Sequence, residues 1–167
     1  MEPLVDRLPE DIDALARHLL EEACGRRLRL ATAESCTGGL IGAILTDVEG
    51  TSHAFERGFI VYSEDAKVGL LGLSRSLIDA EGAVSRPVAL AMAEGALAYS
   101  PADIALAVTG FAGSAGPEGE PGLVHFACIR RGREAAHREE HFGKQGRTAV
   151  RLAAVRVALG MMIDRLD

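Results

Sequence analysis

The sequence predicts a layered α/β domain with a mixed sheet. Segments with strand and helix patterns alternate along the chain, and two strand-like segments follow one another near its end. The length of 167 residues is about that of one domain, which we place over residues 1–167. The hydrophobic share is 48% but only 4% of residues are aromatic, so Ala, Val, Leu and Ile must form the core.

The first half of the chain predicts a helix followed by two strands with helices after each. Apolar residues at helical spacing form one stripe over residues 10–24, and Gly25 is a typical helix stop. Residues 28–33 alternate in the manner of a buried strand. The elements expected next are a helix over 37–47, a strand over 55–62, and helices over 64–71 and 74–81.

The second half predicts a helix, a buried strand, a long loop, a hairpin and a closing helix. Ser85 is a good N-cap, with Pro87 in the first turn, for a helix through residue 98. Residues 103–109 form a short apolar run typical of a strand buried on both faces. The remaining segments are a glycine-rich loop over 110–122, strands over 123–130 and 134–142 joined at 131–133, and a helix over 147–166.

Composition excludes several classes of partner and site. The net charge of -6 argues against nucleic acid as the main partner, because phosphate backbones require a basic surface. The three cysteines lack CxxC spacing, so we expect no zinc site and no other metal or cofactor. Residues 1–10 lack the apolar core of a signal peptide, and no run approaches the ~18 apolar residues of a membrane span. We therefore expect a cytoplasmic protein without membrane contact, and the oligomeric state stays open, with a homodimer as one candidate.

Polar and glycine-rich segments follow three of the predicted strands. They comprise residues 34–39, 62–67 and 109–122. In open α/β sheets, ligands bind at the carboxyl ends of the strands. The coincidence of three such segments therefore predicts a ligand site at this edge.

Ser35 is the candidate nucleophile in the first segment. We expect backbone N–H groups near Gly38 and Gly39 to hold an oxyanion, and glycines also allow a substrate close to the backbone. The alternative is that Ser35 or Thr37 only caps the next helix. Cys36 is a rival nucleophile, although a small buried cysteine is the preferred interpretation.

Lys67 is the candidate base. The chain has 16 Arg and only two Lys, Lys67 and Lys144, so a Lys at a strand end suggests a role that Arg cannot fill. A buried Lys can lose its proton and serve a Ser nucleophile, whereas Arg cannot. The alternative is an ordinary solvated Lys. Tyr62 and Thr109 offer hydroxyls to the same site, or else pack and hydrogen-bond locally.

The glycine-rich loop and the last helix suggest an anion site. The loop lacks the Gly-Lys-[Ser/Thr] ending of a P-loop. Arg147 and Arg151 lie one turn apart at the start of the helix, where cations are mildly unfavourable without an anion. Arg147 and the helix N-terminus therefore predict a bound phosphate or carboxylate, with two solvated arginines as the alternative.

Several motifs together resemble the CinA C-terminal domain family, whose active members are nicotinamide-nucleotide amidases. The resemblance extends from about residue 10 to 165 and rests on Ala-Glu-Ser-Cys-Thr-Gly-Gly at 33–39, Tyr-Ser-Glu-Asp-Ala-Lys at 62–67, Gly-Ala-Val-Ser at 82–85 and Thr-Gly-Phe-Ala-Gly at 109–113. It implies a three-layer α/β/α sandwich with a mixed, mostly parallel sheet of about five or six strands. It also implies deamidation of nicotinamide mononucleotide to nicotinic acid mononucleotide and ammonia, without a metal.

The resemblance assigns roles by motif position. Ser35 is similar to the nucleophile, Lys67 to the base, and Tyr62 and Thr109 to assisting hydroxyls. The residues expected to contact the nucleotide are Cys36, Thr37, Gly38, Gly39, Gly110, Gly113 and Arg147. The loop departs from the family pattern after Gly113, where it is shorter and lacks a Lys. This departure keeps open a second class of function, a weak or inactive domain that binds a nucleotide or a partner.

Overall fold

One five-stranded sheet forms the centre of the molecule, for which a computed structural model describes residues 8–167. The expected absence of a signal peptide concerns residues 1–10, and residues 1–7 lie outside the described part of the chain. The strand order is β2-β1-β3-β4-β5. The strands are β1 (Leu30–Glu34), β2 (Phe55–Ile60), β3 (Ile104–Gly110), β4 (Leu123–Arg130) and β5 (Ala136–His141).

The sheet is mixed, as predicted. Strand β1 pairs in parallel with both β2 and β3, whereas β4 is antiparallel to both of its neighbours, β3 and β5. Four of the five strands therefore point the same way. The antiparallel β4–β5 pair confirms the predicted hairpin.

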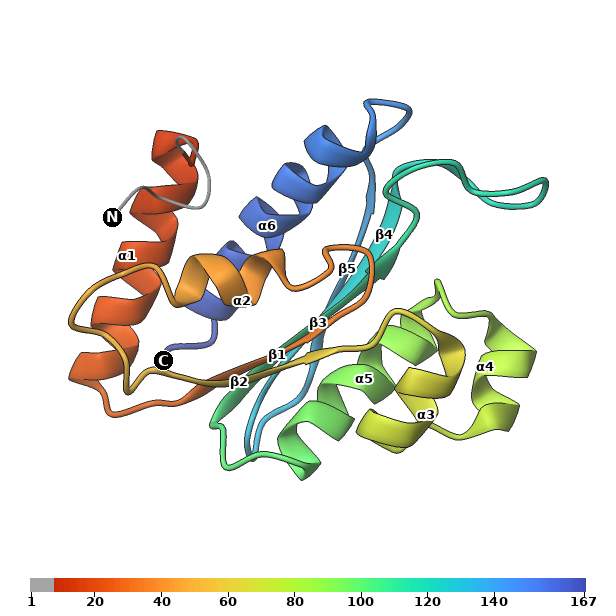
Figure 1. Ribbon diagram of the computed structural model, residues 1–167. Helices are drawn as coiled ribbons and strands as arrows, with labels where there is room; N and C mark the ends of the chain where they lie inside the picture. The colour runs from red at the N-terminus through yellow and green to blue at the C-terminus, as the bar shows by residue number, and fades with distance from the viewer. Residues whose placement is uncertain (1–7) are drawn as a thin grey trace.

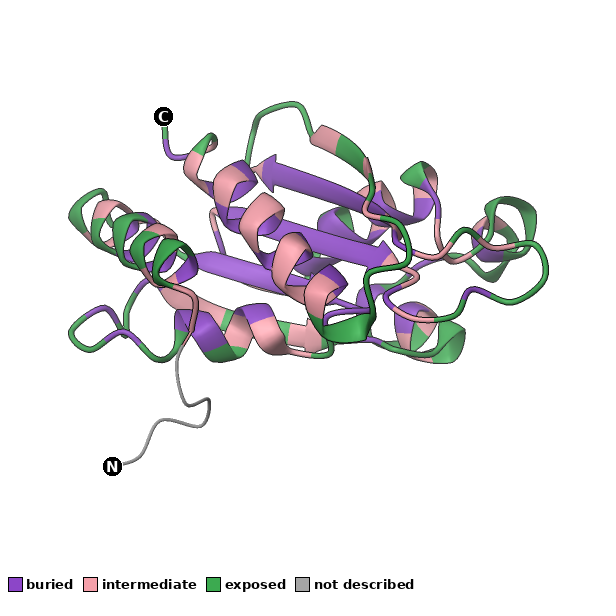
Figure 2. Ribbon diagram, turned by 90° about the horizontal axis from the view of Figure 1, so that it is seen from above, coloured by how far each residue is buried: buried purple, intermediate pink, exposed green. Residues whose placement is uncertain are grey.

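Helices cover both faces of the sheet and complete three layers (Figure 1). One face carries α1 (Glu10–Gly25), α2 (Leu40–Leu45) and α6 (Arg147–Ile163). The other face carries α3 (Glu64–Leu71), α4 (Arg75–Glu81) and α5 (Arg86–Ala98). Figure 2 shows the buried strands beneath helices whose outward surfaces are partly buried or exposed.

The two faces of the sheet differ in the size of their side chains. The α1–α6 face presents large residues such as Leu30, Leu106 and Phe126. The α5 face presents mainly alanines, namely Ala31, Ala33, Ala105, Ala107 and Ala127. Small side chains allow α5 to lie close to the sheet, so a core poor in aromatic residues can still be well packed.

Most predicted elements are present with shifted ends. The strand predicted from residue 28 starts at Leu30, because the Leu28 N–H donates to the Ala23 carbonyl in the turn after α1 (2.8 Å). The helix predicted over 37–47 covers only Leu40–Leu45, because residues 36–39 form a turn. The N-cap role of Ser85 is confirmed by a bond from the Val88 N–H. Within residues 8–167, no helix is long and apolar enough to cross a membrane.

Candidate active site

The three loops that carry the candidate residues meet at one edge of the sheet. Because β1, β2 and β3 are parallel neighbours, their carboxyl ends lie together, as predicted. The chain order reverses at β1, which β2 and β3 flank, and such a switch point leaves a crevice at the strand ends. The Ser35 N–H donates to the Val108 carbonyl at 3.0 Å, which fixes the turn after β1 against β3.

Ser35 and Lys67 form a buried hydrogen-bonded pair. The Nζ of Lys67 donates to the Oγ of Ser35 at 2.9 Å. Lys67 is 2% exposed and Ser35 is 7% exposed. Lys67 reaches this position from α3, where Ser63 caps the helix by accepting a bond from the Ala66 N–H. The fold therefore brings these two candidate residues together.

The surroundings of the Lys67 amine favour its neutral form. Its other two acceptors are the carbonyls of Val61 at 2.9 Å and Tyr62 at 3.4 Å, and it forms no ion pair within residues 8–167. Burial lowers the pKa of Lys67 below its ordinary value, although the charge of Glu64 opposes this effect. A neutral amine has two N–H groups and one lone pair. The two carbonyls can accept the N–H groups, which leaves the lone pair for the Ser35 hydroxyl.

Cys36 is poorly suited to nucleophilic attack. Its side chain is buried, and burial raises the pKa of the thiol to about 12. The thiolate is the reactive form, so Cys36 is protonated and unreactive near neutral pH. The environment of Cys36 therefore favours its interpretation as a small buried residue.

The buried carboxylate of Glu34 organises the turn that carries Ser35. It accepts bonds from the Thr37 hydroxyl at 2.7 Å and from the backbone N–H groups of Ile41 at 3.0 Å and Gly42 at 2.8 Å. Glu34 therefore satisfies the first N–H groups of α2, whose N-cap residue, Gly39, has no side chain to do so. The alternative that Ser35 or Thr37 caps this helix is wrong. Glu34 was not predicted as a functional residue, although an acid at the end of a buried strand is itself a signal.

The two glycines of the turn are required by its backbone. Gly38 has a φ of 61° and Gly39 a φ of 95°, both in the region that side chains disfavour. The Gly38 N–H donates to the Ser35 carbonyl at 3.1 Å, so this one N–H of the turn is not free to bind an oxyanion. The N–H groups of Cys36, Thr37 and Gly39 donate to no acceptor within the described part of the chain.

The candidate hydroxyls of Thr109 and Tyr62 have different environments. Thr109 is 1% exposed, and its hydroxyl donates to the Ala83 carbonyl at 2.8 Å, which ties β3 to the segment before α5. Its oxygen can still accept a bond. Tyr62 is 67% exposed at the end of β2. Tyr62 is therefore free to meet a ligand at the rim.

The start of α6 lies beside the glycine-rich loop. A side chain at Gly113 would place its Cβ 2.6 Å from a guanidinium nitrogen of Arg147, so this glycine makes room for the arginine. Similarly, a Cβ at Gly110 would lie 2.7 Å from the Leu123 carbonyl. The N-cap residue of α6 is Gly146, which gives the helix no side-chain cap. Arg147 forms no ion pair within residues 8–167. The prediction of an anion site thus keeps its two components, an uncapped helix and an unpaired cation.

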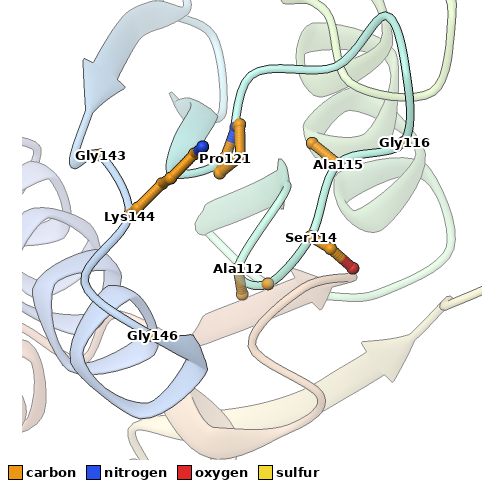
Figure 3. Close-up of a pocket in the computed structure, with 9 residues that line it drawn as sticks. Ala112, Ser114, Ala115, Gly116, Pro121, Gly143, Lys144 and Gly146 are labelled. Atoms are coloured by element: carbon orange, nitrogen blue, oxygen red, sulfur yellow. The ribbon is translucent and has the colours of Figure 1, made fainter.

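A pocket of about 480 Å³ opens between this loop and the segment before α6. Its size is within the range of small-molecule sites. Figure 3 shows Lys144 extending from one wall toward Pro121 on the other. The lining residues are Ala112, Gly113, Ser114, Ala115, Gly116, Pro121, Gly143, Lys144 and Gly146. Ser35 and Lys67 are not among them. Within residues 8–167 no cluster of metal-ligating side chains is present.

Comparison with known proteins identifies the family of this domain. The model of the CinA C-terminal domain matches residues 12–166. The chain belongs to the CinA C-terminal domain family. The CinA-type fold is also the fold of competence/damage inducible protein CihA from Agrobacterium tumefaciens, which is 45% identical with a TM-score of 0.92 over 96% of this chain and 98% of that chain. A CinA superfamily protein from Escherichia coli is 34% identical with a TM-score of 0.88, over 95% of this chain and 94% of that chain.

The curated relatives of this CinA domain are longer proteins. A CinA-like protein from Syntrophobacter fumaroxidans is 42% identical over 166 residues, which are 95% of this chain but 39% of the relative. The chain spans less than half the length of the curated relatives it matches.

Proposed function

We propose that this CinA domain is an amidohydrolase that converts nicotinamide mononucleotide and water to nicotinic acid mononucleotide and ammonia. The observation that carries the proposal is the 2.9 Å contact between the Ser35 hydroxyl and the buried amine of Lys67. A nucleophile beside a base with a lowered pKa is the arrangement that acyl transfer requires. The protein would act in the cytoplasm, where the three free cysteines remain reduced.

In the first half of the reaction, the Oγ of Ser35 bonds to the carboxamide carbon while neutral Lys67 takes the hydroxyl proton. The C–N bond then breaks, and the Lys67 ammonium returns the proton to the departing nitrogen, which leaves as ammonia. The N–H groups of Cys36, Thr37 and Gly39, which have no acceptor among the described residues, are candidates to stabilise the oxyanion.

In the second half, Lys67 takes a proton from water as the water oxygen attacks the ester carbon. The bond from carbon to the Oγ of Ser35 breaks, the hydroxyl regains its proton, and the acid is released. Tyr62 at the rim would assist by proton relay or ring contact, and the oxygen of Thr109 would accept a bond from the carboxamide.

The nucleotide end of the substrate would lie toward the start of α6. A phosphate there would meet the Arg147 guanidinium, the Lys144 amine and the first N–H groups of the helix. The region carries cations without a carboxylate partner, which supports an anionic ligand over a neutral one. This is the basis for preferring a mononucleotide to a free carboxamide.

The test compares nicotinamide mononucleotide with nicotinamide riboside, which lacks the phosphate. We expect equal amounts of ammonia and nicotinic acid mononucleotide from the first, and a KM roughly 10- to 100-fold higher for the second. Arg147→Ala should remove most of this difference, whereas Arg133→Ala, on the hairpin at the other end of the sheet, should preserve it. Calorimetric binding of the mononucleotide without product would instead favour a non-catalytic binding domain. The absence of both binding and product would refute both functions.

A further inference from the structure

Arg151 contacts the turn that carries the nucleophile, from the face of the sheet opposite Lys67. Its Nε donates to the Cys36 carbonyl at 2.9 Å, and its guanidinium lies 3.6 Å from the position that a Cβ at Gly38 would occupy. Arg151 forms no ion pair with any carboxylate of residues 8–167. Its charge is therefore directed at the backbone of the turn.

We infer that Arg151 is a positioning residue that orients and strengthens the Thr37 N–H as a donor to the oxyanion. The inference rests on the proposed function, since it concerns the same reacting centre. Arg151 does not touch the reacting atoms; it acts through the Cys36–Thr37 peptide.

The geometry of a trans peptide links the two ends of this contact. All peptide bonds of the described chain are trans, so the carbonyl and the N–H of one peptide unit point in opposite directions. The Cys36 carbonyl points toward Arg151 on α6, and α6 covers the face opposite α3, which carries Lys67. The Thr37 N–H is consequently directed away from α6, toward the side of the turn on which Lys67 lies.

The neighbouring peptide has the same arrangement with a different donor. The Ser35 carbonyl accepts from the Gly38 N–H, and the Cys36 N–H of that unit has no acceptor within residues 8–167. Two successive peptides thus have their carbonyls held and their N–H groups free. Only the second is held by a full positive charge, which polarises the conjugated amide and makes its N–H a stronger donor.

The contact also explains why the arginine is at position 151. Buried N–H groups without acceptors are rare, and the turn must be held in place for them to persist. Thr37 is 2% exposed, and its hydroxyl bonds to Glu34 on one side while Arg151 holds the preceding carbonyl on the other. The turn is therefore fixed before a substrate arrives, as electrostatic stabilisation requires.

The experiment uses Arg151→Ala and Arg151→Lys, with Arg156→Ala as the matched control on the same helix. Arg156 pairs with Asp11, away from the turn. For Arg151→Ala we expect kcat to fall roughly 10- to 100-fold, with KM for nicotinamide mononucleotide within about twofold, because donor alignment matters in the transition state. Methylguanidinium should restore part of kcat to Arg151→Ala only, and Arg151→Lys should stay within about fivefold of wild type because it keeps a cationic donor.

A second measurement on the ligand-free protein separates this inference from the proposed function. In NMR spectra, the Thr37 amide proton should shift upfield in Arg151→Ala and remain unchanged in Arg156→Ala. If Arg151→Ala does not fold, a smaller upfield shift in Arg151→Lys provides the same test. An unchanged Thr37 signal in the Arg151 variants, or wild-type kcat in Arg151→Ala, would overturn the inference. Inactivity of the wild type would instead remove the proposed function and leave the NMR result to decide the role of Arg151.

Discussion

The amine of Lys67 has an unusual setting for a lysine. It is 2% exposed, its contacts are a hydroxyl and two carbonyls, and it forms no ion pair with a carboxylate of the described residues. Burial favours the neutral amine, whereas the charge of Glu64 favours the ammonium. Burial has the larger effect, so the pKa of Lys67 lies below its ordinary value of 10.5.

The pH dependence of turnover should follow this lowered pKa. The neutral amine is the base, so kcat/KM should rise as the pH increases through the pKa of Lys67 and level off below pH 10.5. Lys67→Arg should lose activity by roughly 10² to 10⁴, because Arg cannot lose its proton. Rates from acidic to alkaline pH, with circular dichroism as a check on folding, would test both statements. A flat pH profile, or an active Lys67→Arg enzyme, would contradict the role of Lys67.

Replacement of Cys36 separates the two adjacent nucleophiles. The pKa of its thiol is raised to about 12 by burial, so Cys36→Ser should keep kcat within about threefold of wild type. Iodoacetamide should likewise inactivate the wild type slowly near neutral pH. Inactivity of a folded Cys36→Ser protein would point to the thiol as the attacking group.

At the scale of elements, the packing of α3 against α5 sets the position of Lys67. The two helices meet at Gly95, where an added Cβ would lie only 2.2 Å from the Leu71 carbonyl. Leu71 is the last residue of α3, and the Lys67 carbonyl lies one turn before it. A side chain at Gly95 must therefore push α3 away from α5.

Gly95→Ala should destabilise the protein by about 1–3 kcal/mol through overpacking, and should lower kcat by displacing Lys67. Gly160→Ala is the matched control, because Gly160 lies inside α6 with no atom within 4 Å of the added Cβ. That change should stabilise the protein by about 1 kcal/mol through helix propensity alone. Denaturant unfolding of both variants measures their free energies of unfolding. Equal changes in this free energy for the two variants would show that the α3–α5 contact is not tight.

A second contact between elements holds the glycine-rich loop to β5. The Nδ1 of His141 lies 2.7 Å from Glu120, next to Pro121 of the pocket, and its Nε2 lies 2.9 Å from Glu139. Both carboxylates raise the pKa of His141 above its ordinary value of 6.5. The folded state therefore binds this proton more tightly than the unfolded state does.

The stability from this contact should be fully present below pH 6.5 and should be lost as the pH rises through the higher pKa of folded His141. The difference in Tm between wild type and His141→Gln should accordingly shrink between pH of about 6 and about 9. High salt should also reduce it, since the three side chains are about half exposed. An NMR titration of His141 that gives a pKa below 6.5 would contradict the assignment.

At the scale of the whole molecule, the sheet brings together residues that are distant in the sequence. Ser35 and Lys67 are 32 residues apart; Ser35 directly follows β1, and Lys67 lies in α3, the helix after the neighbouring parallel strand β2. The strand order and the helices on both faces place the candidate site where the chain reverses its direction of winding (Figure 1). This arrangement follows from the general rule for ligand sites in open α/β sheets.

The sequence predicted most of this arrangement, because its signals are periodic or local. Hydrophobic periodicity located the strands and helices, and the scarcity of Lys pointed to Lys67. The role of Glu34 was not predicted, because its partners Ile41 and Gly42 depend on a turn whose shape no periodicity encodes. Similarly, Arg151 meets Cys36 only through tertiary packing across 115 residues.

Ammonia release from nicotinamide mononucleotide, compared between wild type and Ser35→Ala, tests the central claim most directly. We expect the wild type to release ammonia and nicotinic acid mononucleotide in equal amounts, and a folded Ser35→Ala protein to be slower by at least about 10³-fold. Wild-type ammonia release by Ser35→Ala would contradict the assignment of Ser35 as the nucleophile activated by Lys67.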